Sequence, residues 1–211
     1  MIIPKNFSDL SWVKAGFYDK TECDKVDRPI LMKQVHSADV LVLDTAPTEP
    51  PHLDALVTQK PGLNLTVKTA DCAPILLVDT SSKTIAAIHA GWKGALQGVI
   101  ETTLLKMLSF GAHIETIRAA IGPHLQKQSF QISNDMAMLF PVPEREQFIT
   151  ETEEGLYFDF DAYVIHRLQR AGITDIDSCG IDTYTSSDYN SYRREPESHA
   201  RQYSSIMIKE D

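Results

Sequence analysis

The chain has 211 residues, 43% hydrophobic and 23% charged, which is the composition of an ordinary globular protein long enough to bury a core. Its net charge of −9 repels phosphate backbones, so we expect no nucleic-acid partner. No apolar stretch approaches the roughly 20 residues that span a bilayer, and the first residues lack a signal-peptide pattern, so we expect a cytoplasmic protein with no membrane partner.

Short runs rich in Val and Ile, ending at Gly, Pro, Asp or Ser, predict seven strands. In chain order these strands cover residues 39–43, 53–58, 64–68, 75–79, 84–89, 114–121 and 203–209. Pro-rich sequence predicts a loop that leads into the strand at 53–58, and a second loop at 139–148.

Helical spacing of apolar residues predicts three helices. The first covers about 95–109, with Gly111 just past its end. The second covers about 134–139 after Ser133 as N-cap, and the third about 162–171 after Asp159 or Asp161. Strands outnumber helices and do not alternate with them, which favours an α+β domain over a doubly wound parallel sheet.

The three cysteines do not predict a disulfide framework, because an odd number in a cytosolic chain argues against one. A buried, inert thiol is the default interpretation for each of them. Cys72 has the charged neighbour Asp71 at the start of an apolar strand, and such a charge needs a partner or water.

Two histidines and one lysine are further candidates for chemistry. His89 shares a strand face with Ile85 and precedes a Gly-framed turn in which Lys93 could attract an anion at a helix start. A capped helix with a solvated lysine explains that turn equally well, and His36 resembles the other histidines in pattern. No CxxC or HExxH spacing is present, so pattern alone stops short of a metal site.

Six segments together resemble the YfiH-type "laccase domain" family, which is also described as multicopper polyphenol oxidase-like. The segments are KQVHSADV, DALVT, TADCAPILLVD, AAIHAGWKGAL, IGPHLQKQSFQI and TYTSSDYNSYRRE. They occur in the family's order over roughly residues 30–208. The resemblance implies a single-domain α/β/β/α layered sandwich over residues 1–211, with an N-terminal region shorter than is usual in the family.

The resemblance also implies a site. Zn²⁺ would be bound by His36, Cys72 and His89, with copper as the less favoured alternative. Three protein ligands leave a fourth tetrahedral position open, as in catalytic zinc sites. Cys72, His89 and Asp71 are the candidate catalytic residues. The candidates for binding substrate are Lys93, Arg193, Arg194 and Arg201.

The implied enzyme is a purine nucleoside phosphorylase that splits adenosine, inosine or methylthioadenosine with phosphate and also deaminates adenosine. Its partners would be these small molecules, and the chain would be a monomer or weak homodimer. A Cys-His hydrolase acting on amides or cell-wall precursors and a degenerate, non-catalytic member remain alternatives. Copper-dependent phenol oxidation is disfavoured, because the chain has no H-x-H pair.

Overall fold

A six-stranded sheet forms the centre of the fold in the computed structural model, which describes residues 1–210; Asp211, the last residue of the predicted domain, lies outside the described residues. Its order is β12-β8-β6-β7-β4-β3. The strands are β3 (Val40–Leu43), β4 (Ala55–Thr58), β6 (Ala73–Asp79), β7 (Thr84–Ala90), β8 (Ile117–Ile121) and β12 (Asp175–Ser178). The inner pairs are antiparallel, and the outer pairs β3–β4 and β12–β8 are parallel.

A four-stranded sheet packs against one face of the first, in the order β1-β13-β5-β2. Its strands are β1 (Val13–Phe17), β2 (Pro29–Ile30), β5 (Asn64–Thr69) and β13 (Gln202–Ile208). Because β1 pairs with β13, strands from near the two ends of the described chain lie side by side.

Alternation along the central strands divides the core in two. On β7, Ile85 and Ala87 face the four-stranded sheet, whereas Ala86, Ile88 and Ala90 face the helices. Every residue of β6 and β7 is buried, since both faces of the sheet are covered. This burial makes the ends of these two strands a rigid base for functional side chains.

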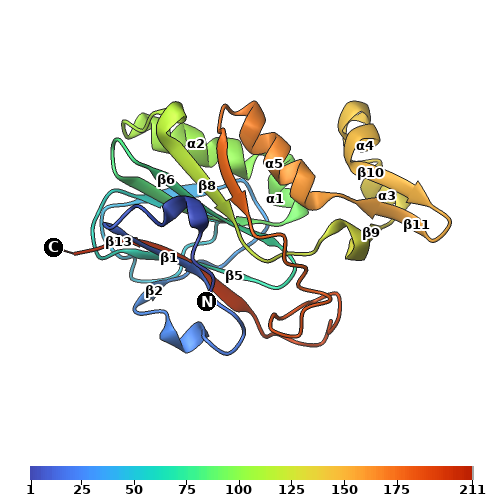
Figure 1. Cartoon of the computed structure of the whole chain (residues 1–211), viewed down its shortest axis with the longest axis horizontal. Helices are drawn as coiled ribbons and strands as arrows, with labels where there is room; N and C mark the ends of the chain where they lie inside the picture. The colour runs from blue at the N-terminus through green and yellow to red at the C-terminus, as the bar shows by residue number, and fades with distance from the viewer. Residues whose placement is uncertain (211) are drawn as a thin grey trace.

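The helical layer covers the other face of the six-stranded sheet with α1 (Trp92–Gln97), α2 (Val99–Ser109) and α5 (Phe160–Arg170), as Figure 1 shows. The single helix predicted over 95–109 is wrong at its start. Gly98 adopts a left-handed conformation with φ of 95°, which ends α1 and separates it from α2. The predicted caps are present: Asp159 accepts a hydrogen bond from the backbone N–H of Ala162 at the start of α5.

A small sheet, β10-β11-β9, projects from one end of the molecule (Figure 1). It comprises β9 (Gln131–Ile132), β10 (Ile149–Thr152) and β11 (Gly155–Phe158), and is flanked by α3 (Asn134–Ala137) and α4 (Val142–Phe148). Ser133 caps α3 as predicted. The loop predicted over 139–148 is wrong from Val142 onwards, because Pro141 and Pro143 lie at the start of α4, where proline needs no helical N–H partner.

The remaining differences from the predicted elements are small. Residues Ile114–Thr116 form the 3-10 turn η3, so the strand predicted from residue 114 begins at Ile117. Strands β1, β2, β9, β10, β11 and β12 were not predicted from the pattern, because most are short or lack regular apolar alternation. The other 3-10 turns are η1 (Lys5–Phe7), η2 (Cys23–Lys25) and η4 (Lys127–Ser129).

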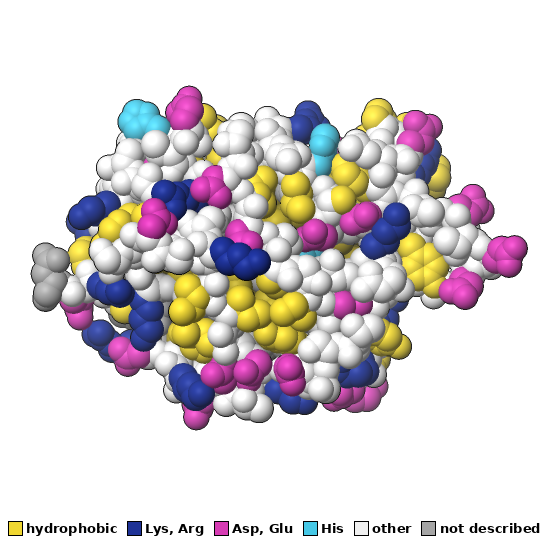
Figure 2. Space-filling view, in the orientation of Figure 1, with side chains coloured by type: hydrophobic (Ala, Val, Ile, Leu, Met, Phe, Trp, Pro, Cys, Tyr) yellow, Lys and Arg dark blue, Asp and Glu magenta, His cyan; other side chains and the backbone are white. Residues whose placement is uncertain are grey.

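The surface carries charges of both signs. On the face shown in Figure 2, acidic and basic side chains are interspersed over most of the surface. Exposed Glu151, Glu153 and Glu154 lie at the β10–β11 hairpin. Among residues 1–210, no helix has the length and apolar character needed to cross a membrane.

Asp79 gives a test of how the β6–β7 hairpin is held. Its buried carboxylate accepts hydrogen bonds from Ser81, Ser82 and Thr116. Burial alone would raise the pKa of Asp79, but the hydrogen bonds from Ser82 and Thr116 hold it below the ordinary value of 3.8. The folded state therefore binds this proton less well than the unfolded chain. The ionised Asp79 carboxylate therefore stabilises the folded state above about pH 4, and this contribution is lost as the pH falls through the pKa of the folded state.

We expect Asp79→Asn to lower the free energy of unfolding by about 1–3 kcal/mol in urea denaturation at neutral pH, because the amide nitrogen cannot accept these bonds. The difference from wild type should shrink near pH 3. Asp44→Asn is the matched control: Asp44 is exposed and has one ion pair, with Lys60, so its effect should stay within about 0.5 kcal/mol. Equal stability of the Asp79 variant and wild type would contradict this account.

Candidate metal centre and substrate cleft

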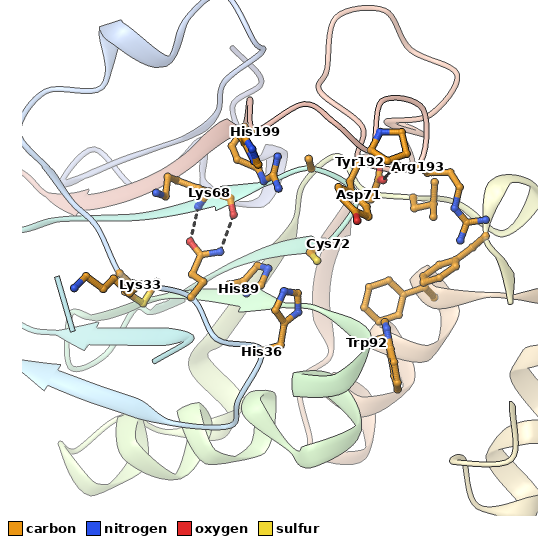
Figure 3. A pocket seen from close by; sticks show the side chains of 18 residues that line it. Lys33, His36, Lys68, Asp71, Cys72, His89, Trp92, Tyr192, Arg193 and His199 are labelled. Atoms are coloured by element: carbon orange, nitrogen blue, oxygen red, sulfur yellow. Dashed lines mark hydrogen bonds between the residues drawn. The ribbon is translucent and has the colours of Figure 1, made fainter. Parts of the chain in front are cut away.

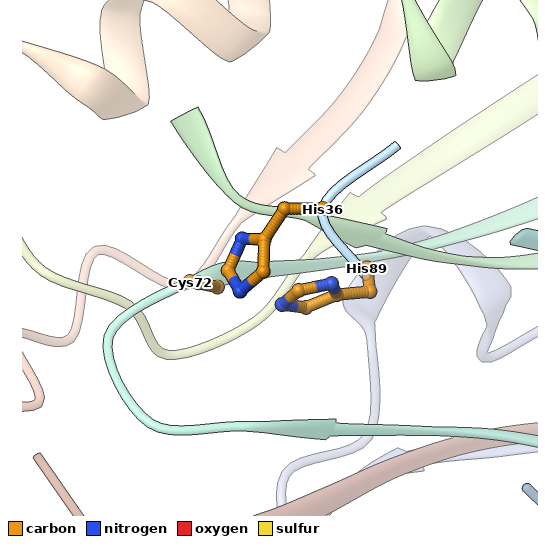
Figure 4. A group of neighbouring side chains, drawn as sticks. All are labelled: His36, Cys72 and His89. Carbon is orange, nitrogen blue, oxygen red and sulfur yellow. The ribbon is translucent and has the colours of Figure 1, made fainter. Parts of the chain in front are cut away.

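Three side chains from separate segments meet at one end of the two sheets (Figure 4). His36 lies in the loop before β3, Cys72 lies between β5 and β6, and His89 is on β7. One ligand atom from each residue lies within 4.8 Å of the others. The imidazole rings meet edge-on, with centroids 4.8 Å apart and an angle of 75° between their planes.

Strand pairing brings two of these residues together. β6 and β7 are antiparallel, with Ala73 opposite Ala90, so Cys72 just before β6 lies near the end of β7. Gly91 then leaves space for the third residue. A Cβ atom at this position would lie 2.3 Å from Nδ1 of His36 and 3.3 Å from Sγ of Cys72. The glycine after His89 therefore permits the close approach of the three groups.

Asp54 orients both histidines. Its carboxylate is fully buried and accepts hydrogen bonds from the backbone N–H groups of Val35, His36 and Ser37, at 3.2, 3.0 and 2.7 Å. It also lies 2.7 Å from Nδ1 of His89. His89 thus donates its Nδ1 proton to Asp54, so Nε2 is the ring nitrogen that would bind a metal once its own proton is displaced.

The charges of this cluster support one another. Burial alone would raise the pKa of Asp54, but hydrogen bonds from His89 and Ser37 lower it to about 2. Burial alone would lower the pKa of His89, whereas the charges and hydrogen bonds of Cys72 and Asp54 raise it to about 9. Asp54 therefore remains a carboxylate, and the protonated form of His89 is stabilised beside it.

The donor set fits a metal ion. A tetrahedral zinc with bonds of about 2.0–2.3 Å keeps its ligand atoms roughly 3.3–3.8 Å apart, so small side-chain rotations would close the three groups around an ion. A thiolate and two imidazoles suit zinc or copper rather than magnesium or calcium. His36 has a left-handed backbone with φ of 61°, which its hydrogen bond to Asp54 helps to hold.

A cleft of about 800 Å³ opens beside the three residues (Figure 3). Its walls carry four basic side chains and one acidic one. These are Lys33, Lys68, Arg193, Arg201 and Asp71. In a protein of net charge −9, this local excess of positive charge favours a small anion inside the cleft.

The cleft has two chemically different sides. Lys33, Lys68 and His199 lie on one side of the three clustered residues in Figure 3, whereas Trp92, Tyr192 and Arg193 lie on the other. Phe130 and Phe160 also line the cleft, and Arg193 stacks over the ring of Phe130 at 5.8 Å. Aromatic faces offer stacking surfaces for a planar heterocycle.

Two of the residues predicted to bind substrate do not line the cleft. Lys93 is exposed on α1, with Nζ 5.5 Å from the ring centroid of Trp92. The Arg194 guanidinium points into the C-terminal loop, which we define as residues 179–201 between β12 and β13. It donates hydrogen bonds to four backbone carbonyls, those of Thr183, Tyr184, Ser186 and Tyr189. Arg194 thus holds the loop, whereas Arg193 and Arg201 line the cleft, and their binding of substrate stays a prediction.

Asp71 lines the cleft, but both of its oxygens are engaged. Oδ1 accepts from the Thr183 hydroxyl at 2.7 Å, and Oδ2 accepts from the Arg193 backbone N–H at 2.6 Å. Its backbone is left-handed, with φ of 82°. These contacts place Asp71 between Cys72 and the C-terminal loop rather than next to the ligand atoms.

Sequence reasoning missed two residues that build the site. Asp54 could have been found as a charged residue directly before the apolar strand β4, where burial requires hydrogen-bond partners. Gln34 carries no such signal. Its amide pairs with both the backbone N–H and the carbonyl of Lys68, as the dashed lines in Figure 3 show. This pairing joins the segment before His36 to the end of β5.

Cys23 and Cys179 are free and only partly buried, so neither is the fully buried thiol of the default interpretation. Burial raises the pKa of Cys179 to about 11 and also raises that of Cys23. Neither side chain lines the cleft. Cys72 is therefore the thiol placed for chemistry.

A substitution at Asp54 tests the metal centre while leaving the three candidate ligands unchanged. We expect Asp54→Asn to weaken Zn²⁺ binding by about 10- to 100-fold, since the amide cannot accept every hydrogen bond that orients His36 and His89. Competition with a chromophoric chelator measures the affinity. Asp39→Asn is the control, because Asp39 is exposed and nearby in sequence. Unchanged zinc affinity in the folded Asp54 variant would refute this role.

Comparison with known proteins places the chain in a family. The family model described as multi-copper polyphenol oxidoreductase laccase matches residues 17–209. A Rickettsia prowazekii protein named purine nucleoside phosphorylase is 33% identical over 187 residues, which are 86% of this chain and 77% of the relative. Purine nucleoside phosphorylase YfiH of Escherichia coli is 31% identical over 171 residues, or 80% of this chain and 69% of the relative.

Solved structures agree with the fold. A Neisseria meningitidis protein matches with a TM-score of 0.80 and 26% identity, over 90% of this chain and 78% of its own. The Bacillus licheniformis protein YfiH matches with a TM-score of 0.86 and 21% identity, over 95% and 94% of the two chains, which supports the fold alone. The predicted fold class and the resemblance are confirmed, and the chain belongs to the YfiH-type laccase-domain family.

Proposed function

We propose that the chain is a metal-dependent purine nucleoside phosphorylase that splits adenosine, inosine or methylthioadenosine with phosphate. The observation that carries this proposal is one cleft in which the His36, Cys72 and His89 cluster lies between a basic side and an aromatic side. The names of relatives at 31–36% identity point to the same reaction.

Phosphorolysis makes two demands on the protein. Phosphate must approach the ribose C1′ atom while the bond to the purine breaks, and the charge that develops must be stabilised in a preorganised site. Lys33, Lys68 and Arg201 offer cations for the phosphate. The rings of Trp92 and Phe130 offer stacking surfaces for the purine.

We assign the metal as Zn²⁺, bound by His36, Cys72 and His89. When bound, zinc supplies Lewis-acid chemistry and raises the reactivity of water near neutral pH. Replacement of the 6-amino group of adenosine by water needs this kind of chemistry, so the proposal includes adenosine deamination as a second activity. We further propose a cytoplasmic protein of one domain, monomeric or weakly dimeric.

Two other chemistries can be compared with the site. Multicopper oxidation needs several metal centres, whereas the described residues contain one group of three or more His, Cys, Asp or Glu side chains that could hold an ion. A Cys-His hydrolase would use Cys72 as nucleophile with His89 beside it, and a bound ion would occupy that thiolate. Its activity would survive metal chelation and be blocked by thiol alkylation.

Product chromatography with adenosine tests the proposal directly. Zinc-loaded protein should form adenine only when phosphate is present, and Cys72→Ser should lower the rate by at least about 100-fold through loss of the metal site. Cys179→Ser is the matched control and should keep wild-type activity, since Cys179 lies outside the cleft. Inosine formed without phosphate would support the deaminase activity. Absence of any product from zinc-containing protein would refute adenosine as substrate.

Lys68 tests the basic side of the cleft. Lys68→Met keeps the aliphatic stem but removes the charge, so the KM for phosphate should rise about tenfold while the KM for nucleoside changes little. Steady-state kinetics with each substrate varied in turn gives both constants. Lys106→Met, on the exposed face of α2, is the control. An equal rise in both KM values would contradict a specific role in phosphate binding.

A further inference from the structure

The C-terminal loop forms one wall of the cleft. Of the residues that line the cleft, this loop supplies Tyr192, Arg193, Pro196, His199 and Arg201. Figure 3 shows Tyr192 and Arg193 close to Asp71, with His199 farther along the wall. The position of this loop therefore decides the shape and the charge of the cleft.

The carboxylate of Asp71 joins this wall to the segment that carries Cys72. Asp71 Oδ1 accepts from the hydroxyl of Thr183 at 2.7 Å, and Oδ2 accepts from the backbone N–H of Arg193 at 2.6 Å. Thr183 and Arg193 belong to two separate turns of the loop. One side chain thus fixes the loop at two points more than 100 residues away in sequence.

Between these two points, the loop is held by its own contacts. The Arg194 guanidinium donates to the carbonyls of Thr183, Tyr184, Ser186 and Tyr189. The Arg193 side chain also reaches the carbonyl of Gln131 on β9, at 2.9 Å. The loop is therefore held at several points, which include bonds from Gln128 and Ser129 to Asp182, and Asp71 is the contact that joins it to the segment of Cys72.

The backbone of Asp71 is anchored on the metal-centre side as well. Asp71 directly precedes Cys72, and its own carbonyl accepts a hydrogen bond from the N–H of Leu125 at 2.9 Å. Its left-handed backbone turns the side chain toward the loop. Because Asp71 and Cys72 are consecutive residues, the loop that forms this wall is bonded to the residue next to a candidate metal ligand.

We infer that Asp71 is a positioning residue, which holds the C-terminal loop over the cleft and so sets the affinity for substrate, rather than a general acid or base. A general acid or base must direct an oxygen at the reacting atoms, whereas both oxygens of Asp71 are oriented by the loop. The kinetic part of this inference rests on the proposed phosphorylase activity. The part that concerns the loop does not.

Three variants separate positioning from acid–base catalysis. Asp71→Ala removes both hydrogen bonds and should raise the KM for nucleoside about tenfold or more, with a smaller change in kcat. Thr183→Val removes one bond, leaves the carboxylate in place and should raise KM about threefold. Asp71→Asn should stay within about threefold of wild type, because its oxygen can accept from Arg193 while its amide donates to the Thr183 hydroxyl.

Asp188→Ala is the control, since Asp188 is an exposed carboxylate on the same loop and lies outside the cleft. It should leave both constants unchanged. Zinc content should equal that of wild type in all four variants. A loss of kcat in Asp71→Asn as large as in Asp71→Ala, with no effect of Thr183→Val, would overturn the inference in favour of a catalytic carboxylate.

Hydrogen exchange measures the loop without any assumption about activity. Peptides from residues 182–201 should exchange faster in Asp71→Ala and Thr183→Val than in wild type, whereas β6 and β7 should be unchanged. Equal exchange of the loop in Asp71→Ala and wild type would refute the inference. If the wild-type protein performed no phosphorolysis, the proposed function would fail, yet this measurement would still decide the role of Asp71.

Discussion

The site depends on the hydrogen bonds that the buried carboxylate of Asp54 accepts. A charge without access to water is tolerated only when hydrogen bonds replace its hydration, and here the donors come from the loop around His36 and from His89. Satisfying Asp54 therefore brings two candidate ligands together and selects the tautomer of one. Cys72 reaches the same point through the pairing of β6 with β7.

The architecture separates a rigid base from adjustable walls. The histidine His89 lies on β7 and Cys72 directly precedes β6, and every residue of these two strands is buried. Most of the basic and aromatic lining comes instead from loops and from the first turns of helices. A metal centre needs ligand positions held within fractions of an ångström, whereas a substrate wall can move with its loop. Asp71 lies where these two parts meet.

The charge of the cleft differs in sign from that of the protein as a whole. The protein as a whole is acidic, yet Lys33, Lys68, Arg193 and Arg201 outnumber the single acidic residue of the cleft. An acidic exterior disfavours long polyanions, while the local positive field of the cleft attracts small ones. This combination suits a protein whose anionic partner is as small as inorganic phosphate.

The sequence by itself determined the central strands, the caps at Ser133 and Asp159 and, through the resemblance, which histidines and cysteine to expect together. These features depend on local periodicity or on short motifs, which a single chain displays directly. Only the folded structure showed that Asp54 orients the histidines and that Arg194 serves the loop instead of the cleft. It also showed that Asp71 faces Thr183 and Arg193. Such hydrogen bonds join segments far apart in the chain, and no local pattern records which distant donor a buried or half-buried carboxylate will meet.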